Sequence, residues 1–384
     1  MRNTWDVIVI GLGAMGSAAL WQLSRRGARV LGIEQGSIGH ALGSSHGGSR
    51  IFRMAYFEHP DYVPLLRRAA RGWSEIERAS QTRLMNQCGL LYGGMTGSKV
   101  IAGVKDSARM YGIALDVVNR RDLGERFPVF AHSCEPMSEY LFEPGAGFVR
   151  PERSIRSFVR VAQRSGAHVR ERTRVDHWEE SGVRVEVHAG GVVETTKQLV
   201  ICAGPWMAHC APQFAAPVVN TRQVIGWVSS HDPVSATSYQ MPAFFMEREA
   251  GEPLYGIPTA HDQDPPYGVK IGIHGDGSVC DPDSIDRRVH AHETQELEAI
   301  MQRVAPGAAG PVTASAVCMY TNTPDGDFVI DRVPQSHRVT VAGGFCGHGF
   351  KFAPVIGELL AEIALAGSTT LPTGFLKRDR FDRA

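Results

Sequence analysis

The chain has 384 residues, of which 43% are hydrophobic and 21% are charged, as is typical of a soluble globular protein. The 40 lysine and arginine residues balance 40 aspartate and glutamate residues, so nothing in the composition indicates a polybasic surface for nucleic acid or membranes, and we expect neither partner. No apolar run approaches the roughly 20 residues that span a bilayer, and the first predicted strand leaves no room for a signal peptide. We therefore expect a cytoplasmic protein.

The cysteines and histidines do not form a recognisable metal motif. Seven cysteines without CxxC spacing are expected to be reduced thiols. The sequence has no HExxH motif, and its one HxH segment, His290-Ala291-His292, stands in a polar, charged stretch. We interpret this pair as solvated and expect no bound metal.

The N-terminal elements in chain order are a strand at residues 6–10, a glycine-rich turn, a helix at 17–27 and a strand at 28–33. This order is typical of a dinucleotide-binding unit, in which the pyrophosphate lies at the N-terminus of the helix. The carboxylate of Glu34, which follows the second strand, can accept hydrogen bonds from a ribose. An ordinary glycine-rich turn is the alternative, and the motif leaves the identity of the dinucleotide open.

The three glycines of the turn, which reads GLGAMG at residues 11–16, have different expected roles. Gly11 allows the tight turn, Gly13 lets the backbone approach the pyrophosphate, and Gly16 lets the helix pack closely on the strand. The turn therefore predicts close contact between a phosphate group and the backbone.

Later elements continue this pattern. Residues 36–50 are too rich in glycine, serine and histidine for a regular element. Residues 215–325 form short alternating runs separated by proline, glycine and aspartate, which favours an antiparallel sheet. The remaining predicted elements are helices at 60–79, 153–165 and 354–366, strands at 167–175, 198–204 and 339–342, and a hairpin with strands at 183–187 and 192–195.

These elements predict an α+β fold with two domains. A doubly wound, Rossmann-like nucleotide domain is assembled from three separated segments, and an antiparallel β-sheet forms the second, substrate domain. The expected boundaries are 1–83, 146–217 and 322–384 for the nucleotide domain, and 84–145 and 218–321 for the substrate domain. A cleft is expected between them.

Two segments combine lysine with closely spaced glycines. Residues 343–349 contain four glycines, a costly arrangement that a large group lying against the backbone would explain, with Lys351 adding a charge. The alternative is a loop tip with a solvated lysine. In residues 268–274 a period of two places Lys270, Gly272 and His274 on one face of a strand. Either a ligand lies over Gly272, or this is a surface strand with a polar face.

Two further features could carry chemistry. Arg50 and Arg53 stand in an apolar context, and arginine fits a carboxylate bidentately. The alternative for this segment is a structural ion pair between an arginine and Glu58. Cys318 is by default a buried, inert core thiol.

Four segments of the chain, taken together, resemble the monomeric sarcosine oxidase family of flavoproteins, within the D-amino acid oxidase-like superfamily. The family also contains N-methyltryptophan oxidase and pipecolate oxidase. The matching segments follow the family's order and spacing over nearly the whole chain: HGGSRIFRMAY at 46–56, KIGIH at 270–274, CMYTNTPD at 318–325 and GFCGHGFKF at 344–352.

The resemblance implies FAD as the cofactor, joined covalently by a thioether from Cys318 to the 8α carbon of the flavin. It places His46 and Arg50 on the flavin face associated with that attachment. The residues expected to bind FAD are Gly11, Gly13, Ala14, Met15, Gly16, Glu34, Gln35, Ser45, His46, Arg50, Val175, Cys318, Gly344, Gly347, Gly349 and Lys351.

The resemblance also implies roles in catalysis. Arg53 and Lys351 would clamp the substrate carboxylate, and Lys270 would promote the reaction of reduced flavin with oxygen through a water at flavin N5. His274 would lie near the substrate amine, and Tyr255 would line the site. His46 and Arg50 complete the residues expected to be catalytic.

The implied reaction oxidises the C–N bond of a small secondary amino acid such as sarcosine or N-methyltryptophan. The imine product hydrolyses, giving formaldehyde and the primary amino acid from an N-methyl substrate, and oxygen is reduced to hydrogen peroxide. The chain departs from the sarcosine oxidases at Met54, at Phe57 and over residues 245–268, a segment that is expected to shape the mouth of the cleft. Pipecolate, proline or glycated amino acids, or a dehydrogenase that uses an electron carrier, therefore stay as alternatives. A monomer is expected.

Overall fold

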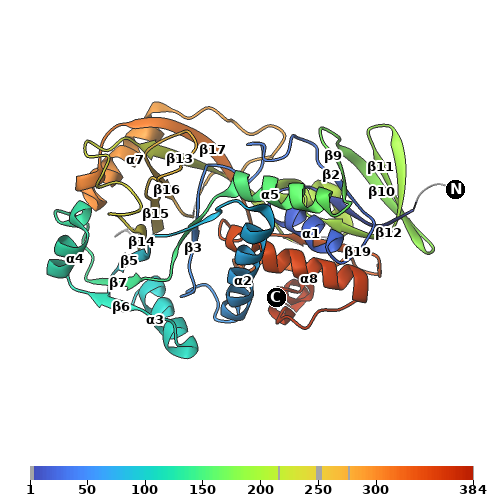
Figure 1. Ribbon diagram of the computed structural model, residues 1–384, viewed down its shortest axis with the longest axis horizontal. Helices are drawn as coiled ribbons and strands as arrows, with labels where there is room; N and C mark the ends of the chain where they lie inside the picture. The colour runs from blue at the N-terminus through green and yellow to red at the C-terminus, as the bar shows by residue number, and fades with distance from the viewer. Residues whose placement is uncertain (1–3, 215–216, 248–252, 276, 384) are drawn as a thin grey trace.

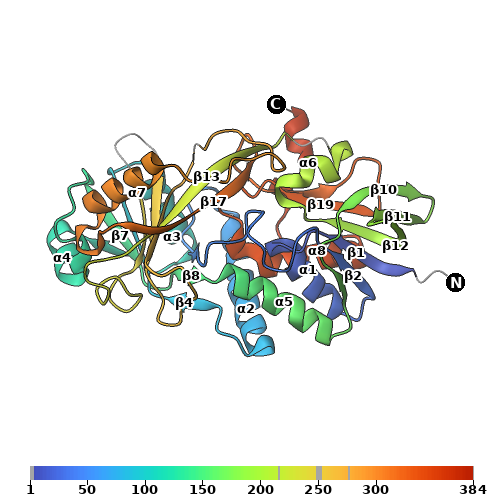
Figure 2. The same cartoon turned by 90° about the horizontal axis from the view of Figure 1, so that it is seen from above.

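The computed structural model describes residues 4–214, 217–247, 253–275 and 277–383. Figures 1 and 2 show an elongated molecule with one β-sheet at the end near the N-terminus and a second sheet at the opposite end. Within the described residues, no helix is both long enough and apolar enough to cross a membrane.

The first sheet has eight strands arranged around a parallel centre. The first strand of the chain pairs in parallel with the second strand on one side and with the twelfth strand on the other. The strands of this sheet are β1 (Trp5–Ile10), β2 (Val30–Ile33), β9 (His168–Arg170), β10 (Val175–Ser181), β11 (Arg184–Ala189), β12 (Val192–Ile201), β18 (Val329–Arg332) and β19 (Val339–Gly343).

The apolar run of β1 is buried on both faces of this sheet. Val7 and Val9 belong to the core on the helical side, and Ile8 and Ile10 belong to the core on the other side. This arrangement follows from the alternation of side chains along a strand and from the covering of both faces that parallel strands require.

Four helices form the helical side of the first sheet, as Figure 1 shows. They are α1 (Ala14–Ser24), α2 (Tyr62–Ser80), α5 (Pro151–Arg164) and α8 (Ala353–Ala366). α1 is buried along its whole length because it packs against both α5 and α8. Gly357 permits the close packing of α1 and α8, since a Cβ there would lie 2.5 Å from the backbone of Ala18.

The second sheet also has eight strands, and all of its neighbouring pairs are antiparallel except the pairing of β14 with β5. Its strands are β5 (Leu90–Gly94), β6 (Asp116–Val118), β7 (Glu139–Glu143), β13 (Val219–Val228), β14 (Ala243–Glu247), β15 (Pro253–Ile257), β16 (Val269–Ile273) and β17 (Val312–Asn322). The helices packed around it are α3 (Lys99–Tyr111), α4 (Arg120–Arg126) and α7 (Ala291–Val304).

A small third sheet and two short helical segments complete the connections that matter for the site. β3 (Arg50–Phe52), β8 (Gly147–Val149) and β4 (Met85–Gln87) form a three-stranded sheet. α6 (Met207–Cys210) follows β12, and a 3-10 turn at Phe350–Phe352 leads into α8. The long strands β13 and β17 run from the second sheet toward α6, as Figure 2 shows.

The structure confirms the Rossmann-like arrangement and the antiparallel sheet, and it corrects three predicted elements. The strand predicted at 167–175 is two strands, because Arg172 adopts a left-handed conformation (φ 52°) that turns the chain between β9 and β10. The strands predicted at 192–195 and 198–204 are one strand, β12, which ends at Ile201. The helix α7 was not predicted.

The domain boundaries stay a prediction. All strands of the first sheet fall within the segments assigned to the nucleotide domain, whereas β4 of the small sheet falls in the other domain. Within the described residues, none of the seven cysteines forms a disulfide.

Candidate functional site

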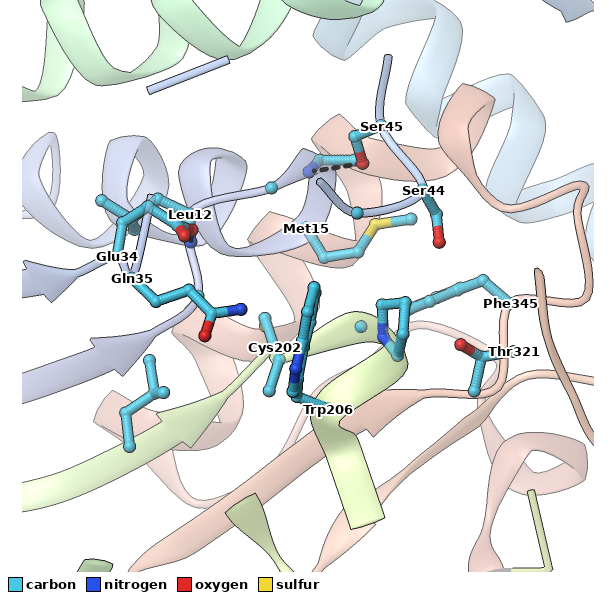
Figure 3. Close-up of a pocket in the computed structure, with 18 of the residues that line it drawn as sticks. Leu12, Met15, Glu34, Gln35, Ser44, Ser45, Cys202, Trp206, Thr321 and Phe345 are labelled. Atoms are coloured by element: carbon cyan, nitrogen blue, oxygen red, sulfur yellow. Dashed lines mark hydrogen bonds between the residues drawn. The ribbon is translucent and has the colours of Figure 1, made fainter. Parts of the chain in front are cut away.

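A long cavity opens at the carboxyl ends of β1 and β2, where nucleotides bind in folds of this type. Figure 3 shows side chains from widely separated segments converging on it. Predicted residues that line it are Gly11, Gly13, Ala14, Met15, Glu34, Gln35, Ser45, Arg50, Val175, Gly344, Gly347 and Gly349.

The glycine turn has the geometry expected from its sequence. Gly11 adopts a φ of +82°, and a Cβ there would lie 2.5 Å from the carbonyl oxygen of Cys202. A Cβ on Gly16 would lie 1.8 Å from the carbonyl oxygen of Gly11, so this glycine serves packing and does not line the cavity. A Cβ on Gly13 would meet only the Ser45 hydroxyl, at 3.5 Å, which leaves the start of α1 accessible from the cavity.

Gly13, the residue before α1, has no side chain that could cap the helix. The positive end of α1 therefore faces the cavity. The backbone N–H of Ala14 donates to the Ser45 hydroxyl at 3.3 Å, the contact drawn in Figure 3. Exposed N–H groups and the helix dipole favour an anion at this position.

The carboxylate of Glu34 is buried at the edge of the cavity. Its Oε2 accepts a hydrogen bond from the backbone N–H of Leu12 (2.7 Å), and its Oε1 contacts the N–H of Gly36 (2.9 Å) and the imidazole of His40 (3.1 Å). Burial alone would raise the pKa of Glu34, but these three partners outweigh it and lower the pKa. The ionised carboxylate keeps lone pairs that can accept a ribose hydroxyl.

A second pocket adjoins the first, since Arg50, Tyr320, Gly347 and Phe350 line both. The other lining residues come from β3 and its following segment, from β13 to β17, and from the loop before α8. They are Ile51, Arg53, Glu58, Gln223, Ile225, Phe245, Tyr255, Ile257, His274, Cys318, His348 and Lys351.

The thiol of Cys318 is buried among cations. The Arg50 guanidinium lies 3.6 Å from its sulfur. Burial would raise the pKa of this thiol, but a contact with the His46 side chain and the charges of His46, Arg50 and Lys270 lower it to about 6. Cys318 is thus buried, but its surroundings favour a thiolate, unlike those of an inert core thiol.

His46 lies outside both sets of lining residues but stays close to this cluster. It is buried, and in the part of the chain that the structure describes its Nε2 has no hydrogen-bond partner. Beside it, Gly47 and Gly48 donate backbone hydrogen bonds at 2.6 Å and 3.2 Å to Oε1 of Glu152, at the start of α5. These bonds fix the loop that carries His46.

The polar face of β16 is buried, so the interpretation as a surface strand is wrong. Lys270 is only 1% exposed, and its Nζ donates to the carbonyl oxygen of Ser49 at 2.6 Å. Burial and the charge of Arg50 lower the pKa of Lys270 well below its usual value. The group that lies over Gly272 is the hydroxyl of Tyr255, 2.7 Å from the position of a Cβ, which corrects the expectation of a ligand there.

Arg53 and Lys351 are both almost completely buried, which excludes the interpretation of Lys351 as a solvated loop residue. Arg53 pairs with Oε1 of Glu58 at 2.5 Å, so the predicted alternative of an arginine–glutamate pair is confirmed. The other carboxylate oxygen of Glu58 has no hydrogen-bond partner among the described residues. Lys351 donates from Nζ to the carbonyl oxygen of His348 at 2.7 Å.

The buried charges of this cluster shift one another's pKa. Burial and the neighbouring Arg53 lower the pKa of Lys351 well below its usual value. Burial would raise the pKa of Glu58, but Arg53, His348 and Lys351 lower it. Arg53 and Lys351 both lie close to the Glu58 carboxylate, and an incoming anion would favour the charged form of Lys351.

His274 also lines the second pocket. Its Nδ1 lies 3.2 Å from the hydroxyl of Tyr320, and its ring contacts Phe245 with the centroids 5.7 Å apart. Burial lowers the pKa of His274 to about 4, so the imidazole is neutral at physiological pH.

Several residues of the site were not predicted. Tyr320 follows Cys318 by two residues on β17, so the period of a strand could have placed both side chains on one face. His348 lies within the glycine-rich segment, but it accepts the hydrogen bond from Lys351 with its backbone carbonyl, a role that the identity of its side chain does not reveal. No local pattern points to Glu152, which reaches the site through tertiary structure.

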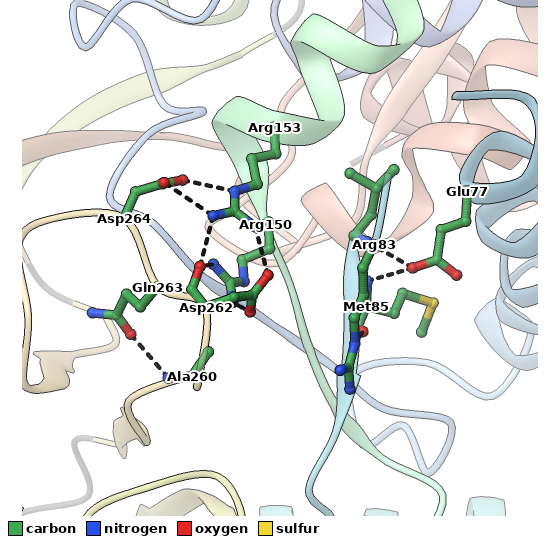
Figure 4. A network of polar contacts seen from close by, with 10 residues as sticks. Glu77, Arg83, Met85, Arg150, Arg153, Ala260, Asp262, Gln263 and Asp264 are labelled. Atoms are coloured by element: carbon green, nitrogen blue, oxygen red, sulfur yellow. Dashed lines mark hydrogen bonds and ion pairs between the residues drawn. The ribbon is translucent and has the colours of Figure 1, made fainter. Parts of the chain in front are cut away.

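The segment 245–268 shapes the pocket only in part. Phe245, Tyr255 and Ile257 line it, whereas the 262–266 insertion does not. Figure 4 shows that this insertion instead joins the start of α5, where Asp262 contacts Arg150 at 2.5 Å and Arg153 at 2.8 Å. Residues 248–252 lie outside the described part of the chain.

Comparisons with known proteins agree with this geometry. A family described as FAD dependent oxidoreductase matches residues 6–363. The chain is 40% identical over 386 residues to a monomeric sarcosine oxidase from Streptomyces avermitilis, with 100% of each chain covered. It is 31% identical over 383 residues to an N-methyl-L-tryptophan oxidase from Salmonella dublin, covering 99% of this chain and 100% of the relative. The solved structure of NikD, an unusual amino acid oxidase essential for nikkomycin biosynthesis, has the same fold, with a TM-score of 0.85 at 20% identity over 98% of each chain.

Proposed function

The chain belongs to the family of FAD dependent oxidoreductases, and we propose that it is an oxidase for a small secondary amino acid with an N-methyl or cyclic amine. The observation that carries this proposal is the meeting of two buried basic side chains, Arg53 and Lys351, with the neutral imidazole of His274 in one pocket beside the cofactor cavity. The basic pair suits a carboxylate, and the imidazole suits an amine.

The residues along the long cavity fit FAD. The uncapped N-terminus of α1 suits the pyrophosphate, and the ionised Glu34 suits the adenosine ribose. Bound FAD would accept a hydride equivalent from the substrate and deliver the electrons to oxygen, giving hydrogen peroxide.

Arg53 and Lys351 bind the substrate carboxylate in this proposal. Arg53 is held between the rings of Tyr56 and Phe57, at 4.3 Å and 4.4 Å from their centroids, so the guanidinium has little freedom. Lys351 is fixed by its bond to the His348 carbonyl. A preformed, water-poor pair of this kind orients the substrate as well as binding it.

The amine of the substrate faces His274 in this proposal. An imidazole with a pKa of about 4 adds no positive charge to the pocket, so it favours a neutral amine over an ammonium. The neutral amine is the form that can be oxidised. The imidazole can also accept a hydrogen bond from the amine N–H at the nitrogen that Tyr320 does not use.

We propose that Cys318 forms the thioether to the flavin that the resemblance implies. The lowered pKa of its thiol supports this role, because a thiolate is the attacking species. Acid precipitation of the protein should leave a yellow pellet. Loss of all flavin to the supernatant, with Cys318→Ala equally yellow before precipitation, would show that the bond is absent.

Lys270 is proposed to promote the reaction with oxygen. Its buried ammonium, when charged, lies beside Arg50 and Cys318, so it places positive charge where oxygen is reduced. Lys270→Met should abolish peroxide production in air while substrate still reduces the flavin without oxygen. Equal loss of both steps would contradict the assignment.

A flavin-bleaching screen tests the proposed function. Sarcosine, N-methyltryptophan, proline, pipecolate and a glycated amino acid are mixed with the holoenzyme without oxygen, and absorbance of the oxidised flavin is followed. At least one of these secondary amines should bleach the flavin, and, where the substrate is an N-methyl amino acid, the corresponding primary amino acid should not. A holoenzyme that none of them bleaches would refute the proposal. The monomeric state and the cytoplasmic location stay predictions.

A further inference from the structure

We infer that the β10–β11 hairpin carries a surface site for a divalent transition-metal ion of the zinc class, formed by His177, Glu179 and His188. One ligand atom from each of these residues lies within 4.8 Å of the other two. The site is separate from the substrate pocket and from the residues that line the cofactor cavity.

The strand register places the three side chains on one face. His177 pairs directly with His188 across the hairpin, and Glu179 follows His177 by two residues. The two imidazoles are stacked, with centroids 4.0 Å apart and planes at 16°. Nε2 of His177 lies 3.5 Å from Oε1 of Glu179.

The distance between two of the ligand atoms is the distance expected between the ligands of a tetrahedrally coordinated ion. Ligands at about 2.0–2.2 Å from zinc lie about 3.3–3.6 Å from one another. The His177–Glu179 separation of 3.5 Å already has this value. All three ligand atoms lie within 4.8 Å of one another, so metal binding would require the His188 ring to rotate toward the other two ligands. The side chains of His177 and Glu179 are 54% and 69% exposed, so water can supply the fourth ligand.

The charges around the site also favour a cation. Glu179 pairs in register with Glu186, and two carboxylates directly opposite each other repel. Within the described residues, neither carboxylate forms an ion pair with a lysine or arginine. A divalent ion would offset this repulsion. Because two of the ligands are imidazoles, the site suits zinc, copper or nickel better than magnesium or calcium.

The opposite face of the hairpin holds these ligands in position. The Trp178 indole donates to the carbonyl oxygen of Cys210 at 2.7 Å, and Val185 and Val187 lie in the core of the first sheet. The ligands therefore stand on an anchored backbone and require only side-chain adjustment.

Isothermal titration of the holoenzyme with ZnCl₂ in a chelator-free buffer tests the inference. One saturable site per chain is expected, and His177→Gln or His188→Gln should each weaken it on the order of tenfold or more. His292→Gln is the matched control, because His292 is an exposed histidine of α7 that also stacks on a neighbouring imidazole, that of His290. The flavin absorbance of each variant checks that it is folded.

A second probe distinguishes this site from scattered surface binding. Cu²⁺ added to the holoenzyme should give an electron paramagnetic resonance signal with nitrogen hyperfine structure that His188→Gln removes and His292→Gln keeps. Zinc binding that is not saturable below about 1 mM, or that is equal in His188→Gln and the unaltered protein, would overturn the inference.

Discussion

The replacement His46→Asn tests how the protein prepares Cys318 for attachment of the flavin. The contact with His46 is the largest of the influences that lower the pKa of this thiol from 9.0 to about 6. With a pKa of about 6, about 90% of the thiol is ionised near neutral pH, whereas about 1% is ionised at a pKa of 9.0. Because the thiolate is the reacting form, removal of His46 should slow attachment by up to about ninetyfold.

The assay mixes apoprotein with FAD and follows acid-precipitable flavin over time at a series of pH values. In the unaltered protein the rate should rise as pH increases through about 6 and then level off, because ionisation is complete above the pKa. In His46→Asn the rise should occur at higher pH, and the two proteins should converge in alkali. Equal rates and equal pH profiles for both proteins would refute this reasoning.

Three further predictions concern the Arg53–Lys351 pair that would bind the substrate carboxylate, the buried imidazole of His274 and the insertion at 262–266. Arg53→Met should raise KM for the amino acid about 10–100-fold, as expected for loss of a charged hydrogen bond, and an unchanged KM in steady-state assays would count against the clamp. His274 has a pKa of about 4 in the folded state and about 6.5 when unfolded, so its protonation favours the unfolded chain. The stability that the neutral His274 contributes is therefore complete above about pH 6.5 and is lost as pH falls toward 4. In urea unfolding at a series of pH values, His274→Gln should flatten the dependence of the unfolding free energy on pH over this range. Asp262→Asn should lower Tm more than Asp264→Asn, because Asp262 pairs with the buried Arg150 whereas Asp264 is 67% exposed; equal shifts in calorimetry would contradict this order.

The elements that could be predicted from the sequence are those specified by local pattern. The apolar run before Gly11 and the period of two around Lys270 depend on neighbouring residues, and the structure has both strands. The break between β9 and β10 could not be predicted, since Arg172 has no local reason for a positive φ. It is held there by tertiary hydrogen bonds, including one from its N–H to the carbonyl oxygen of Gly36 at 2.9 Å.

In the candidate site, too, the residues themselves could be predicted, whereas some of their partners could not. Resemblance and motif brought Arg53, Lys351 and Cys318 into consideration, and the structure gathers them around one pocket. The ion pair of Arg53 with Glu58 could be predicted as an alternative, since the two residues are close in the sequence. The position of the Tyr255 ring over Gly272 could not, because it is set by the pairing of separate strands.

The histidines of the β10–β11 hairpin illustrate a further limit of motif searches. The local motifs CxxC, HExxH and HxH bring only the pair His290 and His292 into consideration. His177 and His188 are eleven positions apart in the chain but are paired in register across the hairpin. None of the three ligands lies on a strand predicted from the sequence, because the predicted hairpin has its strands at 183–187 and 192–195, whereas His177 and Glu179 lie on β10 and His188 on β11.

The yield of hydrogen peroxide tests the central claim most directly. The holoenzyme is given, in air, the secondary amino acid that bleaches its flavin fastest, and peroxide and consumed substrate are measured together. The account predicts equal amounts of the two, with formaldehyde appearing in the same amount if the substrate carries an N-methyl group. Substrate consumption that requires an added electron carrier and yields no peroxide would contradict it.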